Sequence, residues 1–285
     1  MTRRLARFDP LYPKLLAAIY DPPPQLWFRG DIGPELLSQP AVGVVGARDC
    51  SSYGRAVARS LGRDLGIAGV VVVSGMARGV DGEAHRGALD AGAATVAVLG
   101  CGIDRDYPAA HAELARRISE TGLIVSEYEP GIEPAPWRFP ARNRIISGLS
   151  RAVVVVEARE RSGALITVDF ALEQGRDVLA VPGEITSALS AGSNALLRLG
   201  AAPALSVDDI LEAIGIVVAK PEKRALPEGD AGRVLEVLRE APATVDEVSR
   251  AVVLPAAEVA ALLTALELDD LVEAGEGSYR ATIGR

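Results

Sequence analysis

The sequence predicts an α/β protein: an extended Rossmann-like, doubly wound and mostly parallel sheet, followed by a small C-terminal winged-helix domain. Two apolar runs of strand length, residues 42–45 and 70–73, each end in a glycine turn that leads into a helical segment. The same order of strand, turn and helix continues to residue 205, which is typical of doubly wound sheets. Beyond a charged segment the periodicity changes to three helices and a hairpin, the order of a winged helix.

The composition is that of a globular protein with a full core. The 285 residues are 49% hydrophobic but only 4% aromatic, which argues against an aromatic stacking sheet such as an RRM. No uninterrupted apolar run reaches the ~18 residues of a membrane helix, and no secretory signal follows Met1. Cys50 and Cys101 lack CxxC spacing and are expected to be free thiols. We therefore expect a cytoplasmic protein without a membrane partner.

Residues 1–40 are expected to form an irregular lead-in rather than a domain. Three consecutive prolines at positions 22–24 exclude a helix there. The aromatic pair that follows, Trp27 and Phe28, is expected to pack on the edge of the sheet.

Residues 41–215 are expected to form the Rossmann-like domain, because short apolar runs alternate there with longer helical segments. The expected strands cover residues 42–45, 70–73, 94–98, 123–126, 152–156, 177–181 and 203–205. The expected helices cover residues 53–66, 82–91, 109–120, 141–148, a segment from 165, and residues 194–199. The run at 152–156 is the most strongly apolar and is expected to be central.

The turns that follow the strands predict a binding surface along one edge of the sheet. In doubly wound sheets, ligands bind at the carboxyl ends of the strands, where backbone N–H groups and helix N-termini point outward. The turns lie at Gly46, Gly75, Gly100 and Gly102, Ser162 and Gly163, and Pro182 and Gly183. The pattern is not specific, since the chain has neither GxGxxG at the first turn nor a P-loop. Glycines that merely allow helices to pack closely on strands are the alternative interpretation.

The charge distribution favours a phosphate-backbone ligand for the first domain. The net charge of −8 is concentrated at the end, where residues 228–285 hold 12 acidic and 5 basic residues, a charge of −7. Residues 137–161, in contrast, hold six arginines against Glu157 and Glu160, a local charge of +4. Trp137 and Phe139 lie within this basic stretch. Arginines for phosphates and aromatic rings for bases are what a single-stranded nucleic acid requires, although a solvated basic helix is the simpler alternative.

The sequence contains no convincing catalytic, metal or cofactor site. No Ser-His-Asp, HExxH or paired Cys/His set occurs at usable spacing. Asp81 and His85 are four residues apart, but a helix cap and a packed histidine explain them better. His111 is expected on the surface, and Asp104 and Asp106 are expected to brace a loop. We therefore expect a binding protein that is not an enzyme.

The C-terminal part is expected to consist of a linker, residues 216–229, and a winged-helix domain, residues 230–285. Thr244 followed by Glu247 predicts a capping box at the start of its second helix. The expected recognition helix, PAAEVAALLTALELDD, has no Lys or Arg, whereas basic side chains dominate contacts with DNA. A protein-contact or purely structural role is therefore favoured for this domain.

At the level of ordered motifs the sequence resembles the DNA-processing protein family DprA, also called Smf. The resemblance extends over residues 11–205 and is carried by VVGARDCSSYG, VSGMARGVDGEAH, GCGIDRDYP, FPARNRIISGLS, EARERSGALIT and VPG. Each motif is weak alone, but their series in this order is specific. Many members of the family carry an N-terminal helical domain, where this chain has only a short lead-in, and many end in a small winged helix, as here.

The resemblance implies a Rossmann-fold protein that binds single-stranded DNA without sequence preference. It implies a homodimer that protects incoming DNA and loads the recombinase RecA onto it in natural transformation, with a single-stranded-DNA-binding protein as a further candidate partner. The residues carried over by motif are Gly46 and Arg48 for the phosphate pocket, Gly75, Met76 and Ala77 for its neighbouring wall, and Arg138, Phe139, Arg142 and Asn143 for backbone and base, with Ser162 and Gly163 beside them.

The alternative is a nucleotide-processing enzyme that resembles the lysine-decarboxylase-like phosphoribohydrolases. That family uses a PGGxGTxxE motif on a similar sheet, whereas the corresponding segment here reads SGALITVDFALE. Glu173 would be the only acid of such a site. The missing second glycine pair favours the binding protein.

Overall fold

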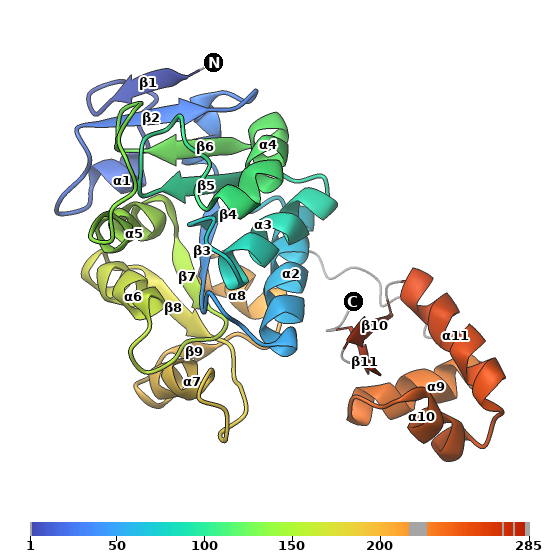
Figure 1. The fold of residues 1–285 in the computed structure, drawn as a ribbon. Coiled ribbons are helices and arrows are strands. Elements are labelled where there is room, and N and C mark those ends of the chain that lie inside the picture. Colours follow the sequence, from blue (N-terminus) through green and yellow to red (C-terminus); the bar gives the residue numbers. More distant parts are fainter. Residues whose placement is uncertain (1, 217–226, 270, 276, 283–285) are drawn as a thin grey trace. The chain divides into compact units, whose positions relative to one another are not determined.

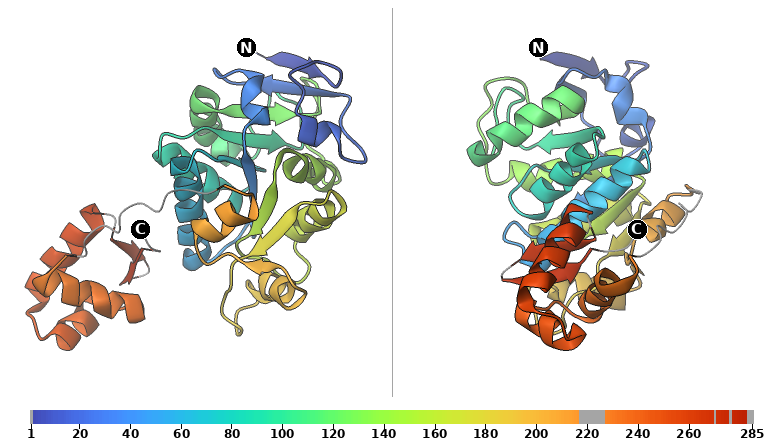
Figure 2. Two further views of the ribbon diagram at one scale, coloured as in Figure 1. Left: turned by 180° about the vertical axis from the view of Figure 1, so that it is seen from behind. Right: turned by 90° about the vertical axis from the view of Figure 1, so that its right-hand side faces the viewer.

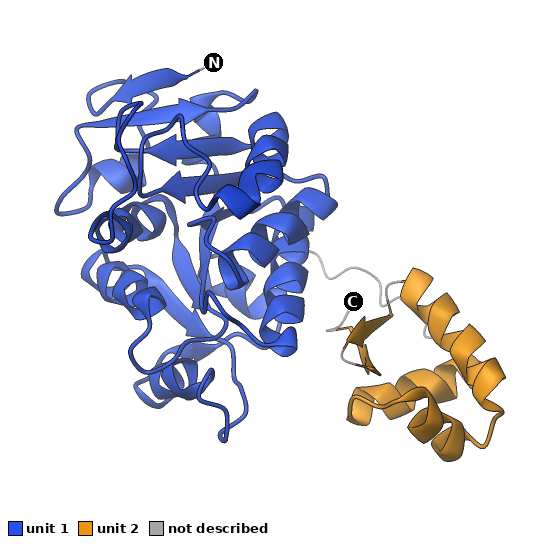
Figure 3. Ribbon diagram, viewed as in Figure 1, with its two compact units in different colours: residues 1–218 blue, residues 219–285 orange. Residues whose placement is uncertain are grey.

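The computed structural model describes residues 2–216, 227–269, 271–275 and 277–282. The chain divides into two compact units, Met1–Val218 and Ala219–Arg285 (Figure 3). Most of the linker expected at residues 216–229 lies outside the described residues.

The first unit is built on a nine-stranded sheet with the order β1-β2-β6-β5-β4-β3-β7-β8-β9 (Figure 1). Its strands are β1 (Arg3–Ala6), β2 (Gln25–Arg29), β3 (Ala41–Val45), β4 (Val71–Ser74), β5 (Thr95–Leu99), β6 (Leu123–Ser126), β7 (Ala152–Val155), β8 (Asp177–Ala180) and β9 (Ala202–Pro203). β2 pairs antiparallel with β1 and β6, and the pairs from β6 to β9 are parallel. The predicted mostly parallel, doubly wound sheet is confirmed.

The expectation of an irregular lead-in over residues 1–40 is wrong, because two of its segments are strands of this sheet. In β2 the buried side chains of Leu26 and Phe28 alternate with half-buried ones, and Trp27 lies opposite Ser126 of β6. β1 contributes only one buried side chain, Leu5, which follows the exposed Arg3 and Arg4. The alternating pattern of β2 covers only five residues and directly follows the three prolines, which lie in the loop before it, so it did not predict a strand.

Helices cover both faces of the sheet (Figures 1 and 2). Their bounds are α1 (Lys14–Ala17), α2 (Ser52–Ile67), α3 (Val80–Asp90), α4 (Ala112–Thr121), α5 (Arg138–Leu149), α6 (Gly163–Glu173), α7 (Ala191–Arg198) and α8 (Val207–Ala213), with short 3₁₀ helices η1 (Pro34–Ser38) and η2 (Ala109–His111). One hydrophobic cluster joins α1, α5 and α6 to the sheet, and another joins α2, α3 and α8 to its opposite face. Every residue of β3, β4 and β7 is buried, as expected for parallel strands covered on both sides.

The chain reverses its direction of winding at β3. From β3 the order runs through β4 and β5 to β6 on one side, and β7, β8 and β9 follow on the other side. Ligands of doubly wound sheets bind where the winding reverses, in the crevice beyond the carboxyl ends of the two strands. The fold therefore directs attention to the ends of β3 and β7.

The second unit has the order of elements that was predicted for a winged helix. It comprises α9 (Gly229–Glu240), α10 (Val245–Val252), α11 (Ala256–Leu268), β10 (Val272–Gly275) and β11 (Ser278–Ala281). The predicted capping box is confirmed, since Glu247 accepts from the Thr244 N–H at 2.8 Å and Thr244 Oγ1 accepts from the Glu247 N–H at 3.3 Å. No single described helix could cross a membrane. α10 and α11 satisfy that test only jointly, across a 108° bend.

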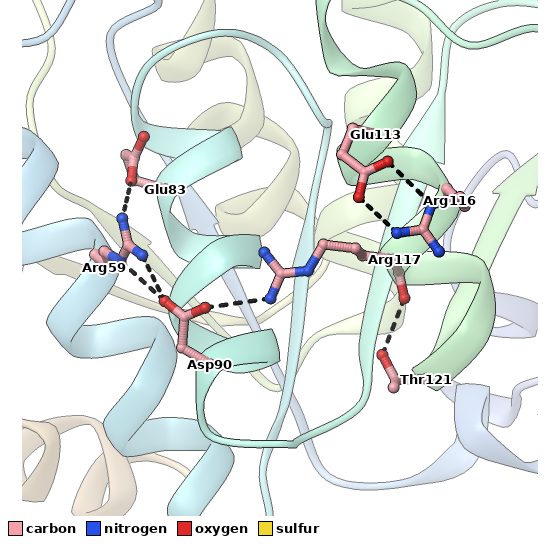
Figure 4. A network of polar contacts seen from close by, with 7 residues as sticks. All are labelled: Arg59, Glu83, Asp90, Glu113, Arg116, Arg117 and Thr121. Carbon is pink, nitrogen blue, oxygen red and sulfur yellow. Dashed lines mark hydrogen bonds and ion pairs between the residues drawn. The ribbon is translucent and has the colours of Figure 1, made fainter.

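A network of ion pairs joins α2, α3 and α4 on the surface (Figure 4). Asp90 of α3 accepts from Arg59 of α2 at 2.7 Å and from Arg117 of α4 at 3.2 Å. Arg59 also lies 3.6 Å from Glu83. Asp90 is therefore the carboxylate that connects three helices.

We expect Asp90→Asn to lower the free energy of unfolding by about 1 kcal/mol at low salt, because two half-exposed ion pairs are lost together. The difference from the wild type should shrink at high salt, where exposed charges are screened. Urea unfolding at two salt concentrations measures both effects. Glu113→Gln, whose carboxylate pairs with Arg116 inside α4, serves as the control and should change stability less. Equal effects of the two substitutions would show that Asp90 does not connect the helices.

Candidate functional site

A pocket of about 380 Å³ lies where the winding of the sheet reverses. It is formed by the segments that follow β3 and β7 and by the first turns of α5 and α6. The residues that line it are Val45, Gly46, Ala47, Arg48, Asp49, Ala77, Asp81, Phe139, Pro140, Arg142, Asn143, Ile146, Arg159, Arg161, Ser162, Gly163, Ala164 and Thr167. The predicted rim of the sheet thus contains a pocket large enough for a small ligand or for one unit of a polymer.

Gly46 allows β3 to end in close contact with its neighbours. A Cβ atom at this position would lie 2.7 Å from Val80 Cγ2 and 2.9 Å from the Glu157 carbonyl oxygen, so only glycine fits. The next N–H, of Ala47, donates to the same carbonyl at 2.7 Å. The chain then turns outward and exposes Arg48 at the rim.

Glu157 fastens the end of β7 to the start of α2. This buried carboxylate accepts from the Ser51 N–H at 2.9 Å and from Ser51 Oγ at 2.6 Å. Ser51 is the N-cap of α2 and in turn accepts from the Gly54 N–H at 3.0 Å. From the sequence Glu157 was expected only as a charge, although its contacts hold the segments after β3 and β7 that frame the pocket.

The turn after β4, residues 75–77, is held from two sides. Asp81 Oδ2 accepts from the N–H groups of Gly75 at 3.2 Å and Ala77 at 3.3 Å, and His111 Nδ1 lies 3.0 Å from the Met76 carbonyl oxygen. Met76 has a φ of 55° and is fully buried, and these contacts offset the strain of that conformation. Asp81 lies inside α3, whose N-cap is Gly79, so it caps the preceding turn rather than the helix. The expected surface position of His111 is wrong, since its side chain is buried.

Arg142 lies beneath the pocket and is buried, in contrast to the expectation of an arginine free to hold DNA. Its Nη1 donates to the carbonyl oxygen of Gly75 at 3.0 Å and to that of Val98. Burial lowers the pKa of its guanidinium to about 10. Burial also raises the pKa of Asp81, while the nearby Arg142 charge acts in the opposite direction. The two side chains form a polar layer that supports residues 75–77.

Phe139 and Asn143 extend from α5 toward the mouth of the pocket. The Phe139 ring stacks on Tyr107 with a centroid distance of 5.1 Å, and the Arg48 guanidinium lies 5.7 Å from its centroid. Asn143 Nδ2 donates to the Gly163 carbonyl oxygen at 3.2 Å and so ties α5 to the start of α6.

The N-terminus of α6 faces the same pocket. Its N-cap, Ser162, accepts from the Ala164 N–H at 3.3 Å, and a Cβ atom on Gly163 would meet only open space. Both residues line the pocket, so the partial positive charge of this eleven-residue helix is directed into it.

The structure brings most of the predicted site residues together. Those that line the pocket are Gly46, Arg48, Ala77, Phe139, Arg142, Asn143, Ser162 and Gly163. Gly75, Met76 and Arg138 do not line it. Gly75 and the buried Met76 lie behind the wall, and Arg138 contacts the rings of Trp137 and Tyr128 outside it. The geometry thus does not support their contact with a ligand inside the pocket.

Two arginines of the pocket were missed as individual site residues. Arg159 and Arg161 follow β7, are exposed, and line the pocket together with Arg48. Within the described part of the chain, none of the three forms an ion pair. The signal was present in the basic stretch 137–161, but its other arginines have different roles: Arg144, for example, pairs with Glu127 at 2.7 Å.

The pocket combines three exposed cations, a helix N-terminus and an aromatic side chain. The cations and the helix N-terminus suit an anion such as the phosphate of a nucleotide unit. Across the described ranges, no group of three or more His, Cys, Asp or Glu side chains could hold a metal ion. The described cysteines, Cys50 and Cys101, are free thiols.

Residues 3–215 match the family described as DNA recombination-mediator protein A. The chain belongs to this family. Residues 218–278 match the DprA winged helix domain, so the DprA/Smf resemblance and the winged-helix fold are both confirmed.

Relatives of the DprA family support this assignment. The chain is 42% identical over 269 residues to a putative DprA of Mycobacterium tuberculosis H37Rv. The matched region covers 90% of this chain and 68% of the relative. It is 45% identical over 207 residues to DprA of Streptococcus pneumoniae, 71% of each chain. The crystal structure of the latter superposes with a TM-score of 0.70 over 74% of this chain and 73% of that one.

A third relative is DNA processing protein A of Helicobacter pylori. Its structure has a TM-score of 0.67 at 30% identity and covers 75% of this chain and 95% of that one. It is described as giving insight into the unique single-stranded DNA binding mode of that protein.

Proposed function

We propose that this member of the DprA family binds single-stranded DNA without sequence preference, with a phosphate seated in the pocket beyond the carboxyl ends of β3 and β7. The observation that carries this proposal is the set of three exposed arginines that line the pocket together with the N-terminus of α6. Electrostatic and helix-terminus contacts recognise the DNA backbone and not the base sequence. The single-stranded-DNA-binding relative from Helicobacter pylori adds support.

We also propose that the protein acts as a binder and not as an enzyme. The two carboxylates at the pocket are Asp49, on its surface, and Asp81, which is occupied with the turn at 75–77. Glu173, the acid of the alternative phosphoribohydrolase hypothesis, is the last residue of α6 and does not line the pocket. The geometry therefore favours DNA binding over nucleotide hydrolysis.

The wider role rests on the family resemblance. We infer that the protein works in the cytoplasm as a homodimer, protects incoming DNA and loads RecA onto it in natural transformation. A single-stranded-DNA-binding protein is a further proposed partner. For the winged-helix unit we propose a protein contact, because α11 carries no Lys or Arg.

We expect Arg48→Ala and Arg161→Ala each to weaken binding of a labelled oligothymidine about 10-fold, since each removes a charge-assisted contact with a phosphate. Each substitution should also reduce the salt dependence of the affinity. The wild type should bind duplex DNA less well than the single strand. Fluorescence anisotropy across a salt series measures all three effects. Arg198→Ala removes an exposed arginine at the end of α7, outside the pocket, and should leave the affinity unchanged.

Two outcomes would contradict the proposed function. A wild-type protein that ignores single-stranded DNA would rule it out, and equal losses for Arg48→Ala and Arg198→Ala would move the site elsewhere. Turnover of a nucleoside monophosphate, measured in parallel, would instead support the enzyme hypothesis.

A further inference from the structure

The aromatic side chain nearest to a nucleotide pocket is expected to stack on a base, but Phe139 is already engaged. Tyr107 stacks on its ring with an interplanar angle of 28°, and Arg48 lies over the ring as well. On its inner side the ring fills the space above Gly100, where a Cβ atom would lie 2.8 Å from Phe139 Cδ1. Phe139 therefore offers little free ring surface to a base.

Trp137, two residues earlier, has the free surface that Phe139 lacks. Its side chain is 62% exposed, compared with 42% for Tyr107. It is the N-cap residue of α5, and Phe139 and Pro140, which follow in the first turn, both line the pocket. The exposed indole thus belongs to a residue two positions before the pocket-lining Phe139.

The indole is also held in position by a cation. The Arg138 guanidinium lies 4.7 Å from the Trp137 ring centroid and 5.1 Å from that of Tyr128. The same guanidinium donates to the Glu133 carbonyl oxygen, which fixes it against the loop. The Glu133 carboxylate is paired with Arg105 at 2.5 Å and so is partly neutralised. An exposed ring held beside a positive charge is the combination that binds a base and its phosphate.

We propose that Trp137 and Arg138 form a second nucleotide position, at which a base of the strand leaving the pocket stacks on the indole. This proposal rests on the proposed function, because it extends the path of the same DNA strand. It predicts that the pocket alone binds short oligonucleotides, whereas longer ones also reach Trp137. Because every base has a ring face, this position adds affinity without adding sequence preference.

Intrinsic fluorescence tests the proposal directly, because the chain has two tryptophans. In a Trp27→Phe background the remaining emission comes from Trp137. Oligothymidines of about 16 nucleotides should quench it, whereas those of about 4 nucleotides, which occupy the pocket, should quench it little. Trp137→Ala should lose about 10-fold in affinity for the longer oligonucleotide and much less for the shorter one. Trp137→Phe keeps a ring and should retain most of the affinity.

Phe8→Ala is the matched control, since Phe8 is a 94% exposed aromatic side chain after the edge strand β1 and does not adjoin the pocket. It should bind like the wild type. If the wild type binds and Arg48→Ala weakens binding, but Trp137 emission and the Trp137→Ala affinity stay unchanged at both lengths, the second position is ruled out and the proposed function stands. If the wild type binds neither length, both proposals fall together.

Discussion

Arg142→Ala is expected to lower the free energy of unfolding by about 3 kcal/mol or more. The substitution leaves the carbonyl oxygens of Gly75 and Val98 without their buried donor. It also removes the positive charge that offsets the burial of Asp81. Urea unfolding at neutral pH measures the loss.

The neighbouring substitution Asn143→Ala provides the control. Asn143 is half-exposed. Its amide donates to the Gly163 carbonyl oxygen at 3.2 Å and accepts from Arg142 Nε at 3.3 Å, so its removal should cost only about 1 kcal/mol. If Arg142→Ala proved as stable as Asn143→Ala but failed to bind DNA, Arg142 would be a ligand contact and not a support. If it is destabilised as expected, a loss of binding in that variant says little about direct contact.

Acidification from pH 7 to pH 5 is expected to cost about 2 kcal/mol of stability through His85 alone. Thr95 donates its hydroxyl proton to the Val72 carbonyl oxygen at 2.7 Å, so at 2.8 Å it accepts from His85 Nδ1. Nε2 is left unprotonated and buried, without a hydrogen-bond partner among the described residues. Burial, with nearby His111, Arg142 and Arg86, lowers the pKa of His85 to about 3.

The direction of this pH effect follows from the protonation of the His85 imidazole in the unfolded and folded states. In the unfolded chain His85 takes up a proton below about pH 6.5. In the folded protein its imidazole stays neutral until about pH 3. The contribution of neutral His85 to stability is thus fully present above about pH 6.5 and is lost as the pH falls from there toward about pH 3. His85→Gln, which can still donate to Thr95, should remove this part of the pH dependence. Parallel stability curves for wild type and variant would contradict the expected titration.

The central part of the fold follows from the sequence, because buried parallel strands have a strong local signature. β3, β4 and β7 are almost entirely valine and alanine, and each is followed by a turn and a helix. β1 and β2 lack such a signature. They are short, antiparallel and arginine-containing, and their place depends on the pairing of β2 with β6, which is distant in the sequence. Local patterns do not encode that pairing.

The candidate site could be predicted by position but not by the state of each side chain. The glycine turns and the basic stretch located the pocket, yet six arginines of one stretch have different surroundings. Arg142 is buried, Arg144 is paired, and Arg159 and Arg161 are exposed. These differences depend on whether tertiary packing supplies a carboxylate or a carbonyl oxygen, which no local pattern specifies. The buried position of His111 has the same origin.

Both outer strands of the sheet are poor templates for another chain. β1 exposes Arg3 and Arg4, and β9 has two residues, of which Pro203 has no N–H to donate. Like charges and a missing donor oppose the addition of a further strand, which protects a nine-stranded sheet against edge-to-edge aggregation. We therefore expect that two copies of this unit would contact each other through side chains and helices and not by joining their sheets.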